Sequence, residues 1–224
     1  HGVEVTRLAV SSNGLISSDD LKKAIKPNTF LVSIMTVNNE IGSVQQIREI
    51  AKVIRHARKV DDKGYNKDVI APSKYPLLHT DASQAALYSG LNVEQLGVDL
   101  LTLDSSKVYG PRGMGALYIR RSTPIEPIIY GGGQERGLRS GTENVPTIMG
   151  FAKALDLAAL ERDQEIVRLM EFKGFFLAGL MVIDPNIADN PRGSESSLTQ
   201  SPAILNVSIP GIDNDMFVLR LDAK

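Results

Sequence analysis

Cysteine is missing from all 224 residues of this chain. Without cysteine the chain forms no disulfide, holds no metal through thiolates and has no cysteine nucleophile within these residues. Its three histidines, His1, His56 and His79, are too dispersed along the sequence to suggest a metal site. The composition therefore gives no support to thiol-based or metal-based chemistry carried by these residues.

A charge bias and long apolar runs are missing as well. Twenty-five basic side chains stand against 26 acidic ones, a formal net charge of −1, and no basic block is present that would follow a nucleic-acid backbone or an anionic membrane. No apolar run approaches the length that crosses a bilayer, and the first residues lack the charged and apolar regions of a signal peptide. We expect no nucleic-acid partner, no membrane and a cytoplasmic location.

The sequence does contain an alternation of strand-like and helix-like segments. Short apolar runs bounded by turn formers predict strands, and apolar residues at helical spacing predict helices between them. The expected strands are residues 30–35, 77–81, 100–103, 115–119 and 203–209, and the expected helices are residues 18–25, 46–59, 93–96, 147–181 and 213–221. This order predicts an α/β fold with a mostly parallel sheet flanked by helices.

Three further expectations concern the ends and interruptions of this pattern. Residues 3–9 alternate like a strand that starts abruptly, which suggests a fragment that begins within a domain. Residues 61–76 are polar and resemble an inserted surface loop. Gly174 is expected to interrupt the long helix. We expect one large domain over residues 1–163 and the start of a small α+β domain over residues 164–224.

Polar clusters follow three of the expected strands. They are Asn38-Asn39-Glu40, Asp81-Ala82-Ser83-Gln84 and Asp104-Ser105-Ser106-Lys107. In open α/β sheets ligands bind beyond the carboxyl ends of the strands, so these clusters are the candidate site. A single polar residue at a strand end is just as often a helix cap or a solvated turn, and the combination carries the argument.

Lys107 is the candidate nucleophile of this site. It follows a buried strand and precedes the sharp turn Tyr109-Gly110-Pro111-Arg112-Gly113. A desolvated lysine attacks aldehydes as a neutral amine, which is the Schiff-base chemistry of pyridoxal phosphate, although an isolated lysine in a loop is usually a surface residue. A carboxylate such as Asp81 can hold a pyridine nitrogen protonated, and Gln84 and Asn39 can donate to a phenolic oxygen.

A glycine-rich segment, residues 131–137, leads into Arg139-Ser140-Gly141-Thr142. Backbone N–H groups and hydroxyls in such a loop can approach an anion, and a plain tight turn explains the glycines equally well. The segment does not have the Walker A spacing, and no G-x-G-x-x-G leads from a strand into a helix. Nucleotide binding by these motifs is therefore disfavoured.

These motifs resemble the cysteine desulfurase and selenocysteine lyase family, within the class V aminotransferase-like enzymes of pyridoxal phosphate fold type I. The resemblance covers nearly the whole chain in family order, with the loop at residues 61–76 as the main difference in length. The segments that carry it are residues 32–42, His79-Thr80-Asp81-Ala82-Ser83-Gln84, Lys107-Val108-Tyr109-Gly110-Pro111-Arg112-Gly113, residues 115–118, residues 131–142 and Ile204-Leu205-Asn206-Val207-Ser208.

The resemblance implies a role for each matching residue. Lys107 would form the Schiff base, Asp81 would pair with the pyridine nitrogen, and Gln84 and Asn39 would contact the phenolic oxygen. Thr142 would reach the cofactor phosphate of a neighbouring subunit, which implies a homodimer with shared sites. The implied reaction converts L-cysteine to L-alanine and leaves the sulfur as an enzyme persulfide, which a sulfur-acceptor protein takes up for iron–sulfur clusters or thio-cofactors.

Two departures from the family pattern stand out. The family lysine usually follows Ser-x-His, whose serine binds the phosphate, whereas this chain has Asp104 and Ser106 at those positions. Ser106 still has a hydroxyl, but an anionic Asp104 repels a phosphate and is expected to cap the turn instead. The second departure is truncation: by the resemblance, the family's upstream phosphate loop and ring-stacking histidine would lie before His1, and its persulfide cysteine and substrate-carboxylate arginine beyond Lys224. We therefore expect these 224 residues alone to be inactive on cysteine.

Two alternatives remain open at this stage. One is a related pyridoxal-phosphate-dependent lyase or aminotransferase, such as a selenocysteine lyase, which needs no cysteine nucleophile. The other is a catalytically silent interaction subunit with the same fold, suggested by Asp104, Ser106 and the missing cysteine.

Overall fold

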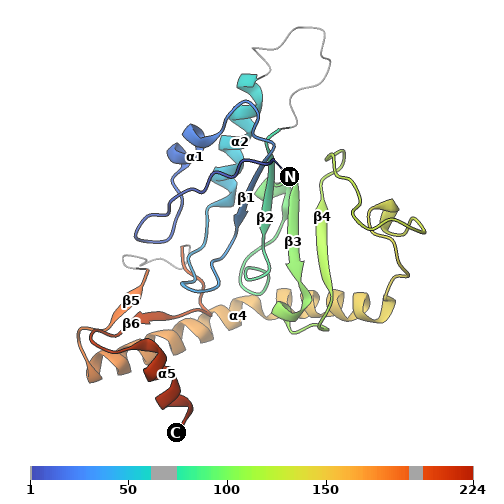
Figure 1. The fold of residues 1–224 in the computed structure, drawn as a ribbon. Helices are drawn as coiled ribbons and strands as arrows, with labels where there is room; N and C mark the ends of the chain where they lie inside the picture. Colours follow the sequence, from blue (N-terminus) through green and yellow to red (C-terminus); the bar gives the residue numbers. More distant parts are fainter. Residues whose placement is uncertain (1, 62–74, 192–198, 224) are drawn as a thin grey trace.

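The computed structural model describes residues 2–61, 75–191 and 199–223 of the chain (Figure 1). Most of the expected inserted loop, residues 62–74, lies outside these ranges. A four-stranded sheet forms the centre, with β1 (Leu31–Met35), β2 (Leu77–Asp81), β3 (Leu100–Asp104) and β4 (Gly115–Ile119) in that spatial order. The first three strands are parallel and β4 is antiparallel to β3, which confirms the prediction of a mostly parallel sheet.

One face of the sheet is covered by α1 (Ser18–Ala24) and α2 (Ile47–Asp61). Ile50 and Ile54 of α2 are almost fully buried and belong to one apolar cluster with Leu78 and Leu101 of the sheet. Side chains alternate between the faces of a strand, so Ser33, His79 and Thr102 lie on the opposite face. The short helix α3 (Val93–Leu96) adds Leu96 to the same core.

The amino end of β2 is fixed by a buried carboxylate. Asp99 accepts a hydrogen bond from the backbone N–H of Leu78 at 2.8 Å and is paired with the guanidinium of Arg58. The Nε atom of Arg120 approaches the same carboxylate at 3.5 Å. This cluster lies at the end of the sheet away from the polar strand ends, so its role is to hold the strands in place.

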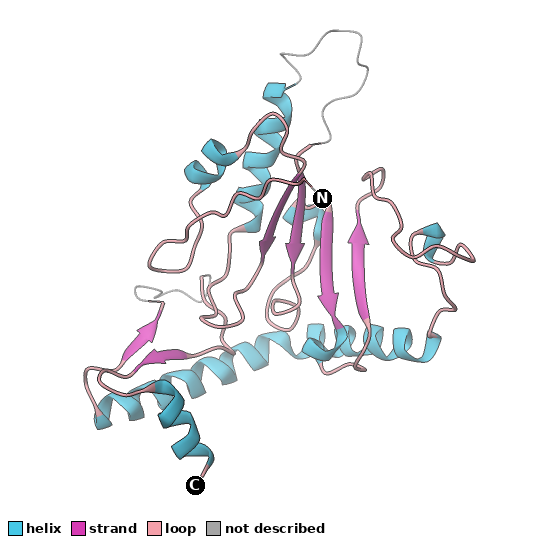
Figure 2. Cartoon of the chain, viewed as in Figure 1, coloured by secondary structure: helices cyan, strands magenta, loops and turns pink. Residues whose placement is uncertain are grey.

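The longest helix, α4 (Val145–Ile183), passes the carboxyl ends of the parallel strands (Figure 2). Asn144 caps its first turn by accepting from the N–H of Thr147. The helix leads to a two-stranded antiparallel sheet of β5 (Ala188–Asn190) and β6 (Asn206–Ser208), and the described chain continues into α5 (Asn214–Asp222). Two short 3-10 helices, η1 (Ser105–Val108) and η2 (Glu135–Gly137), complete the elements of the described residues.

Three predictions of local structure were wrong. Residues 3–9 are not a strand, and Val3 and Val5 are exposed; an alternating pattern forms a strand only where a neighbour pairs with it. Gly174 does not interrupt α4, because one glycine costs a helix only about 1 kcal/mol. The strand expected at residues 203–209 is reduced to β6, and its partner β5 was not predicted because Ala, Asp and Asn rarely form strands.

The expected domain boundary after residue 163 stays a prediction. In the structure α4 runs without a break across that position.

Candidate active site

The carboxyl ends of β1, β2 and β3 lie side by side at one edge of the sheet. Asp81 is the last residue of β2, paired in register with Met35 of β1 and with Thr102 of β3. Its side chain is exposed and accepts a hydrogen bond from the N–H of Ser83 at 2.9 Å. The turn that follows is held against the core by the fully buried Ala82. The backbone at Asp81 is therefore held in place, and its carboxylate faces outward.

Lys107 lies in η1, directly after β3. The turn is anchored by its first and last residues, because Ser105 and Val108 are buried, while Ser106 and Lys107 between them are exposed. Val108 packs in a small apolar cluster with Phe151 of α4. The buried ends of η1 thus keep the amine of Lys107 on the outside of the turn.

Close backbone packing behind Lys107 requires glycine. A Cβ atom added to Gly110 would lie 2.3 Å from the Oγ of Ser105 and 3.3 Å from the Cβ of Ala154 in α4. Tyr109 closes η1 with a left-handed backbone, φ 60°, and the N–H of Gly110 bonds to the carbonyl of Ser105 at 2.9 Å. The sharp turn expected after Lys107 is therefore present and is tightly packed against α4.

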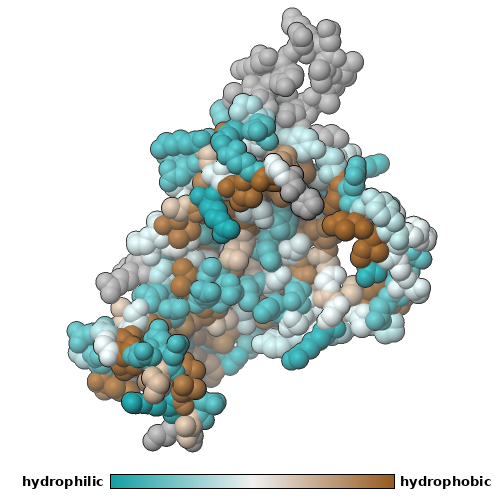
Figure 3. Space-filling model, in the orientation of Figure 1, coloured by the Kyte–Doolittle hydropathy of each residue, from teal (hydrophilic) through white to brown (hydrophobic). Residues whose placement is uncertain are grey.

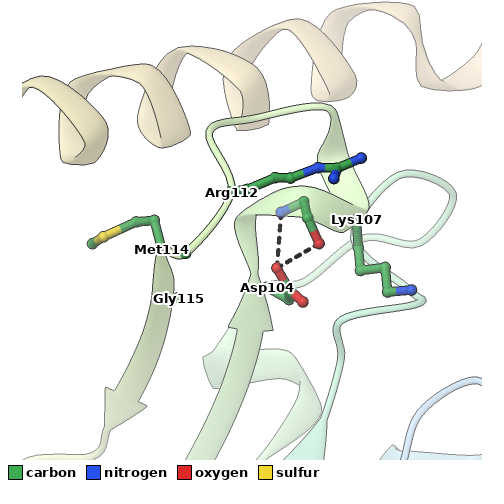
Figure 4. A pocket seen from close by; sticks show the side chains of 7 residues that line it. Asp104, Lys107, Arg112, Met114 and Gly115 are labelled. Carbon is green, nitrogen blue, oxygen red and sulfur yellow. Dashed lines mark hydrogen bonds between the residues drawn. The ribbon is translucent and has the colours of Figure 1, made fainter.

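An open hollow of about 630 Å³ lies beside this turn (Figure 4). Its charged lining residues are Asp104, Lys107 and Arg112. The complete lining is Asp104, Ser106, Lys107, Arg112, Gly113, Met114 and Gly115. A lysine and an arginine beside one hollow suit a ligand that carries an aldehyde and an anionic group.

Asp104 has two hydrogen bonds, both from Ser106. Its Oδ1 atom accepts from the Ser106 hydroxyl and from the Ser106 N–H, each at 2.8 Å, and these bonds are drawn in Figure 4. The hydroxyl bond first and the N–H bond second lower the pKa of Asp104 below its ordinary value, and the nearby Lys107 ammonium adds to the shift. Asp104 thus caps η1 as expected and is ionised at neutral pH.

His79 connects the three parallel strands below Asp81. Its Nδ1 atom lies 2.8 Å from the Ser33 hydroxyl of β1, and its Nε2 atom lies 3.4 Å from the Thr102 hydroxyl of β3. Burial lowers the pKa of the half-buried His79, and the Asp81 carboxylate opposes part of that shift. The prediction that His79 lies on the strand face of Asp81 is confirmed by its position two residues earlier in β2.

The structure brings together only some of the predicted site residues. Asp104, Ser106 and Lys107 line the hollow, whereas Asp81, Gln84 and Asn39 are not part of its lining. Asn39 is exposed in the turn after β1, and Gln84 is half-buried in the turn after β2. Their roles stay predictions.

Thr142 is exposed in the segment beyond β4, between η2 and α4, and is not part of the lining either. Its role was expected toward a neighbouring subunit, and it also stays a prediction.

Besides two glycines, two lining residues were not predicted from the sequence as site residues. Arg112 and Met114 belong to the turn that leads from Lys107 into β4. The signal was available for Arg112, because it stands within the Tyr109–Gly113 turn that was expected to approach a ligand. The side chain of Met114 carried no such signal.

The fold and this turn define a class of protein. It is an α/β protein with a lysine at the carboxyl ends of a mostly parallel sheet, where ligands of open α/β folds bind, although Lys107 is exposed and not desolvated as expected. The family model described as "Aminotransferase class-V" matches residues 1–61 and 67–222. The chain belongs to the class V aminotransferase family, whose members depend on pyridoxal phosphate.

Individual relatives share similarity over the whole chain. The chain is 39% identical over 228 residues to the cysteine desulfurase IscS of Dictyoglomus turgidum, covering 100% of this chain and 51% of the relative. It is 41% identical over 222 residues to the mitochondrial cysteine desulfurase of Candida albicans, covering 98% of this chain and 41% of the relative. The chain thus spans about half the length of such relatives. Because one of these relatives is mitochondrial, a cytoplasmic location stays a prediction.

Solved structures give the same result for the fold. A NifS-like protein has a TM-score of 0.83 at 33% identity, over 99% of this chain and 55% of the other. DndA from Streptomyces lividans has a TM-score of 0.77 at 32% identity, over 99% and 57%. The fold is therefore that of the fold type I enzymes, as predicted.

Among the described helices none combines the length and the apolar character that crossing a membrane requires. Within the described residues no three His, Asp or Glu side chains gather as a metal-binding group.

Proposed function

We propose that the whole protein is a pyridoxal-phosphate-dependent cysteine desulfurase, with L-cysteine as substrate and L-alanine and an enzyme-bound persulfide as products. One observation carries the proposal: the exposed Lys107 lies in η1, whose first and last residues are buried, beside a hollow at the carboxyl ends of the strands. Relatives named cysteine desulfurase, 39% and 41% identical over nearly the whole chain, support the choice among class V reactions. The cysteine that receives the sulfur is not among these 224 residues.

The residues at the site suit the proposed cofactor in most respects. Lys107 supplies the amine that bonds to the cofactor aldehyde, and Asp81 supplies a carboxylate for the pyridine nitrogen. Arg112 offers a cation beside the same hollow, whereas the Ser106 hydroxyl already donates to Asp104. When bound, pyridoxal phosphate supplies an electron sink that stabilises negative charge on the Cα of an amino-acid substrate.

Each residue of this chain then has a distinct task. The Nζ atom of Lys107 would accept the proton from the substrate Cα. Asp81 would accept a hydrogen bond from the ring nitrogen and so keep a proton there. The amides of Gln84 and Asn39 would donate to the phenolic oxygen. The packed turn from Tyr109 to Gly113 keeps Lys107 in position.

Assembly follows from the same proposal. Thr142 extends from the exposed segment beyond β4, where it would complete the phosphate site of a second copy. We infer a homodimer that shares its two sites and hands sulfur to an acceptor protein.

The decisive experiment uses the protein expressed from its complete gene, with Lys107→Ala as the test variant. Parent protein incubated with pyridoxal phosphate and borohydride should carry a reduced adduct on Lys107, found by peptide mass spectrometry. Lys107→Ala should lose the adduct and at least about a hundredfold in alanine formation from L-cysteine, since proton transfer alone contributes that much. Lys52→Ala, an exposed lysine of α2, is the matched control and should keep both.

The outcomes separate the possible functions. An adduct without alanine or persulfide formation would favour a related lyase or aminotransferase over the desulfurase. A complete protein that never takes up pyridoxal phosphate would be an interaction subunit and would contradict the proposal.

A further inference from the structure

The lining of the hollow beside Lys107 includes an anion, which the proposed function does not use. Asp104 lines the hollow together with Ser106, Lys107 and Arg112. Its carboxylate is held by two hydrogen bonds of 2.8 Å from Ser106, and the hydroxyl of Ser106 is one of the two donors. A second anion that enters this hollow therefore meets a fixed negative charge, and the Ser106 hydroxyl already has an acceptor.

The phosphate of the cofactor would lie within reach of that charge. The aldehyde of pyridoxal phosphate and its phosphate-bearing arm are attached to adjacent ring carbons. A ring whose aldehyde reaches Lys107 therefore carries its phosphate close to η1, and Asp104 precedes Lys107 by only three residues in the same lining. Charges interact without much screening within a Debye length of about 8 Å at physiological salt.

We propose that the carboxylate of Asp104 opposes the phosphate group and so lowers the preference of this site for pyridoxal phosphate over pyridoxal, which lacks the phosphate. Arg112 and the Thr142 hydroxyl of a second copy would favour the phosphate and Asp104 opposes it, while the aldehyde and the ring would meet the same groups in both ligands. Asp104 is thus a specificity-determining residue. This inference rests on the proposed function, because it requires that Lys107 receives an aldehyde of this kind.

The variant Asp104→Asn separates the charge from the cap. Asparagine caps a helical turn about as well as aspartate, so its side-chain oxygen can still accept from the Ser106 N–H, but the negative charge is gone. The complete apoprotein is titrated with pyridoxal phosphate and with pyridoxal, and absorbance gives the two dissociation constants. The ratio of these constants measures the selectivity for phosphate.

Asp104→Asn should raise the selectivity ratio at least about fivefold, because two unit charges a few ångströms apart interact at least this strongly near a protein surface. The gain should come from tighter binding of pyridoxal phosphate, with the pyridoxal constant changed less than about twofold. Asp104→Ser, which also keeps a capping oxygen, should give the same result and serves if the first variant folds poorly. Asp20→Asn, an exposed carboxylate of α1, is the matched control and should leave the ratio unchanged.

The possible failures are distinguishable. If both ligands bind but the ratio stays within about twofold of the parent in Asp104→Asn and Asp104→Ser, Asp104 does not set phosphate selectivity. If the parent protein binds neither ligand, the proposed function fails and this inference fails with it.

Discussion

The sheet region, residues 18–120, and the C-terminal region, residues 152–222, differ in how they bury apolar side chains. In the sheet region Ile50, Ile54, Leu78 and Leu101 are at most 2% exposed. In the described part of the C-terminal region, residues 152–191 and 199–222, Ile187 is the one buried hydrophobic residue. Figure 3 shows apolar side chains at the surface over the end of α4 and over α5.

This difference in burial shows which region holds the candidate site in place. A helix or a sheet is stable when its apolar face is covered by another layer, and α2 covers the sheet in this way. The distal part of α4 exposes 82% of Phe175 and 87% of Val182. Asp81 and Lys107 both belong to the well-packed region, while Phe151 near the start of α4 connects that helix to η1. The following predictions test this contrast, from the largest expected effect to the smallest.

Removing core volume should separate the two regions most clearly. Ile50→Ala deletes three carbons from a fully buried position of α2 and should lower the free energy of unfolding by about 3 kcal/mol. Phe175→Ala removes a larger side chain from an exposed position and should change it by less than about 0.5 kcal/mol. Urea unfolding of the two variants measures both effects. Equal losses would mean that Phe175 is packed and that the contrast is wrong.

Breaking a buried ion pair of the sheet region should lower stability more than breaking an exposed pair of α4, and both effects should be smaller than that of Ile50→Ala. Asp99→Asn leaves the Arg58 guanidinium and the Leu78 N–H with a weaker partner in a buried place, so we expect a loss of about 2 kcal/mol. Glu165→Gln breaks an exposed pair with Arg168 in α4 and should not change the unfolding midpoint measurably. A midpoint for Asp99→Asn that matches the parent would contradict the structural role of this cluster.

Two glycines give a matched pair of opposite sign. Gly110→Ala forces a Cβ to within 2.3 Å of the Ser105 Oγ and should cost about 1.5 kcal/mol through overpacking. It should also weaken cofactor binding, because η1 positions Lys107. Gly174→Ala meets nothing within 4 Å and should stabilise α4 by about 0.7 kcal/mol. Thermal unfolding gives both signs, and a stabilising Gly110→Ala would show that the turn behind Lys107 is loose.

The smallest effect concerns the pH dependence of stability. Burial lowers the pKa of His79 in the folded protein, so the unfolded chain binds the proton first as pH falls below about 6.5. The stabilising contribution of neutral His79 is present above that pH and is lost as pH falls through the lower folded pKa. His79→Gln should therefore flatten the loss of thermal stability between about pH 7 and pH 5.

The exposed His56 of α2 provides the control for this measurement. His56→Gln should follow the parent curve. A His79→Gln curve as steep as that of the parent would show that other groups cause the acid sensitivity.

Much of the fold was predictable because local signals agreed with tertiary packing. The strand at residues 77–81 and the helix at residues 93–96 were predicted with the bounds that β2 and α3 have, since Pro76 precedes the strand and Asn92 and Gly97 flank the helix. Residues 3–9 show the opposite case. Their alternating pattern had no pairing partner in the described structure, and pairing is a property of two segments rather than one.

The candidate site also has a part that was predictable from the sequence and a part that was not. The residues after each strand pointed to Asp81 and Lys107, because polar side chains at strand ends are visible in the order of the chain. The sequence did not show that Arg112 shares a hollow with Lys107, since that depends on how the turn returns into β4. It also did not show that His79 bridges Ser33 and Thr102, which requires the register of three strands.

The sequence by itself determined the α/β order of elements, the polar clusters at the strand ends and the resemblance to a pyridoxal-phosphate family. Only the tertiary structure decided which of those polar residues meet. Asp104 makes this plain: the sequence showed an acidic residue where the family has serine, and the folded turn ties its carboxylate to Ser106 beside Lys107. The reason is physical, because hydrogen bonds and charges act over a few ångströms, and only folding fixes those distances.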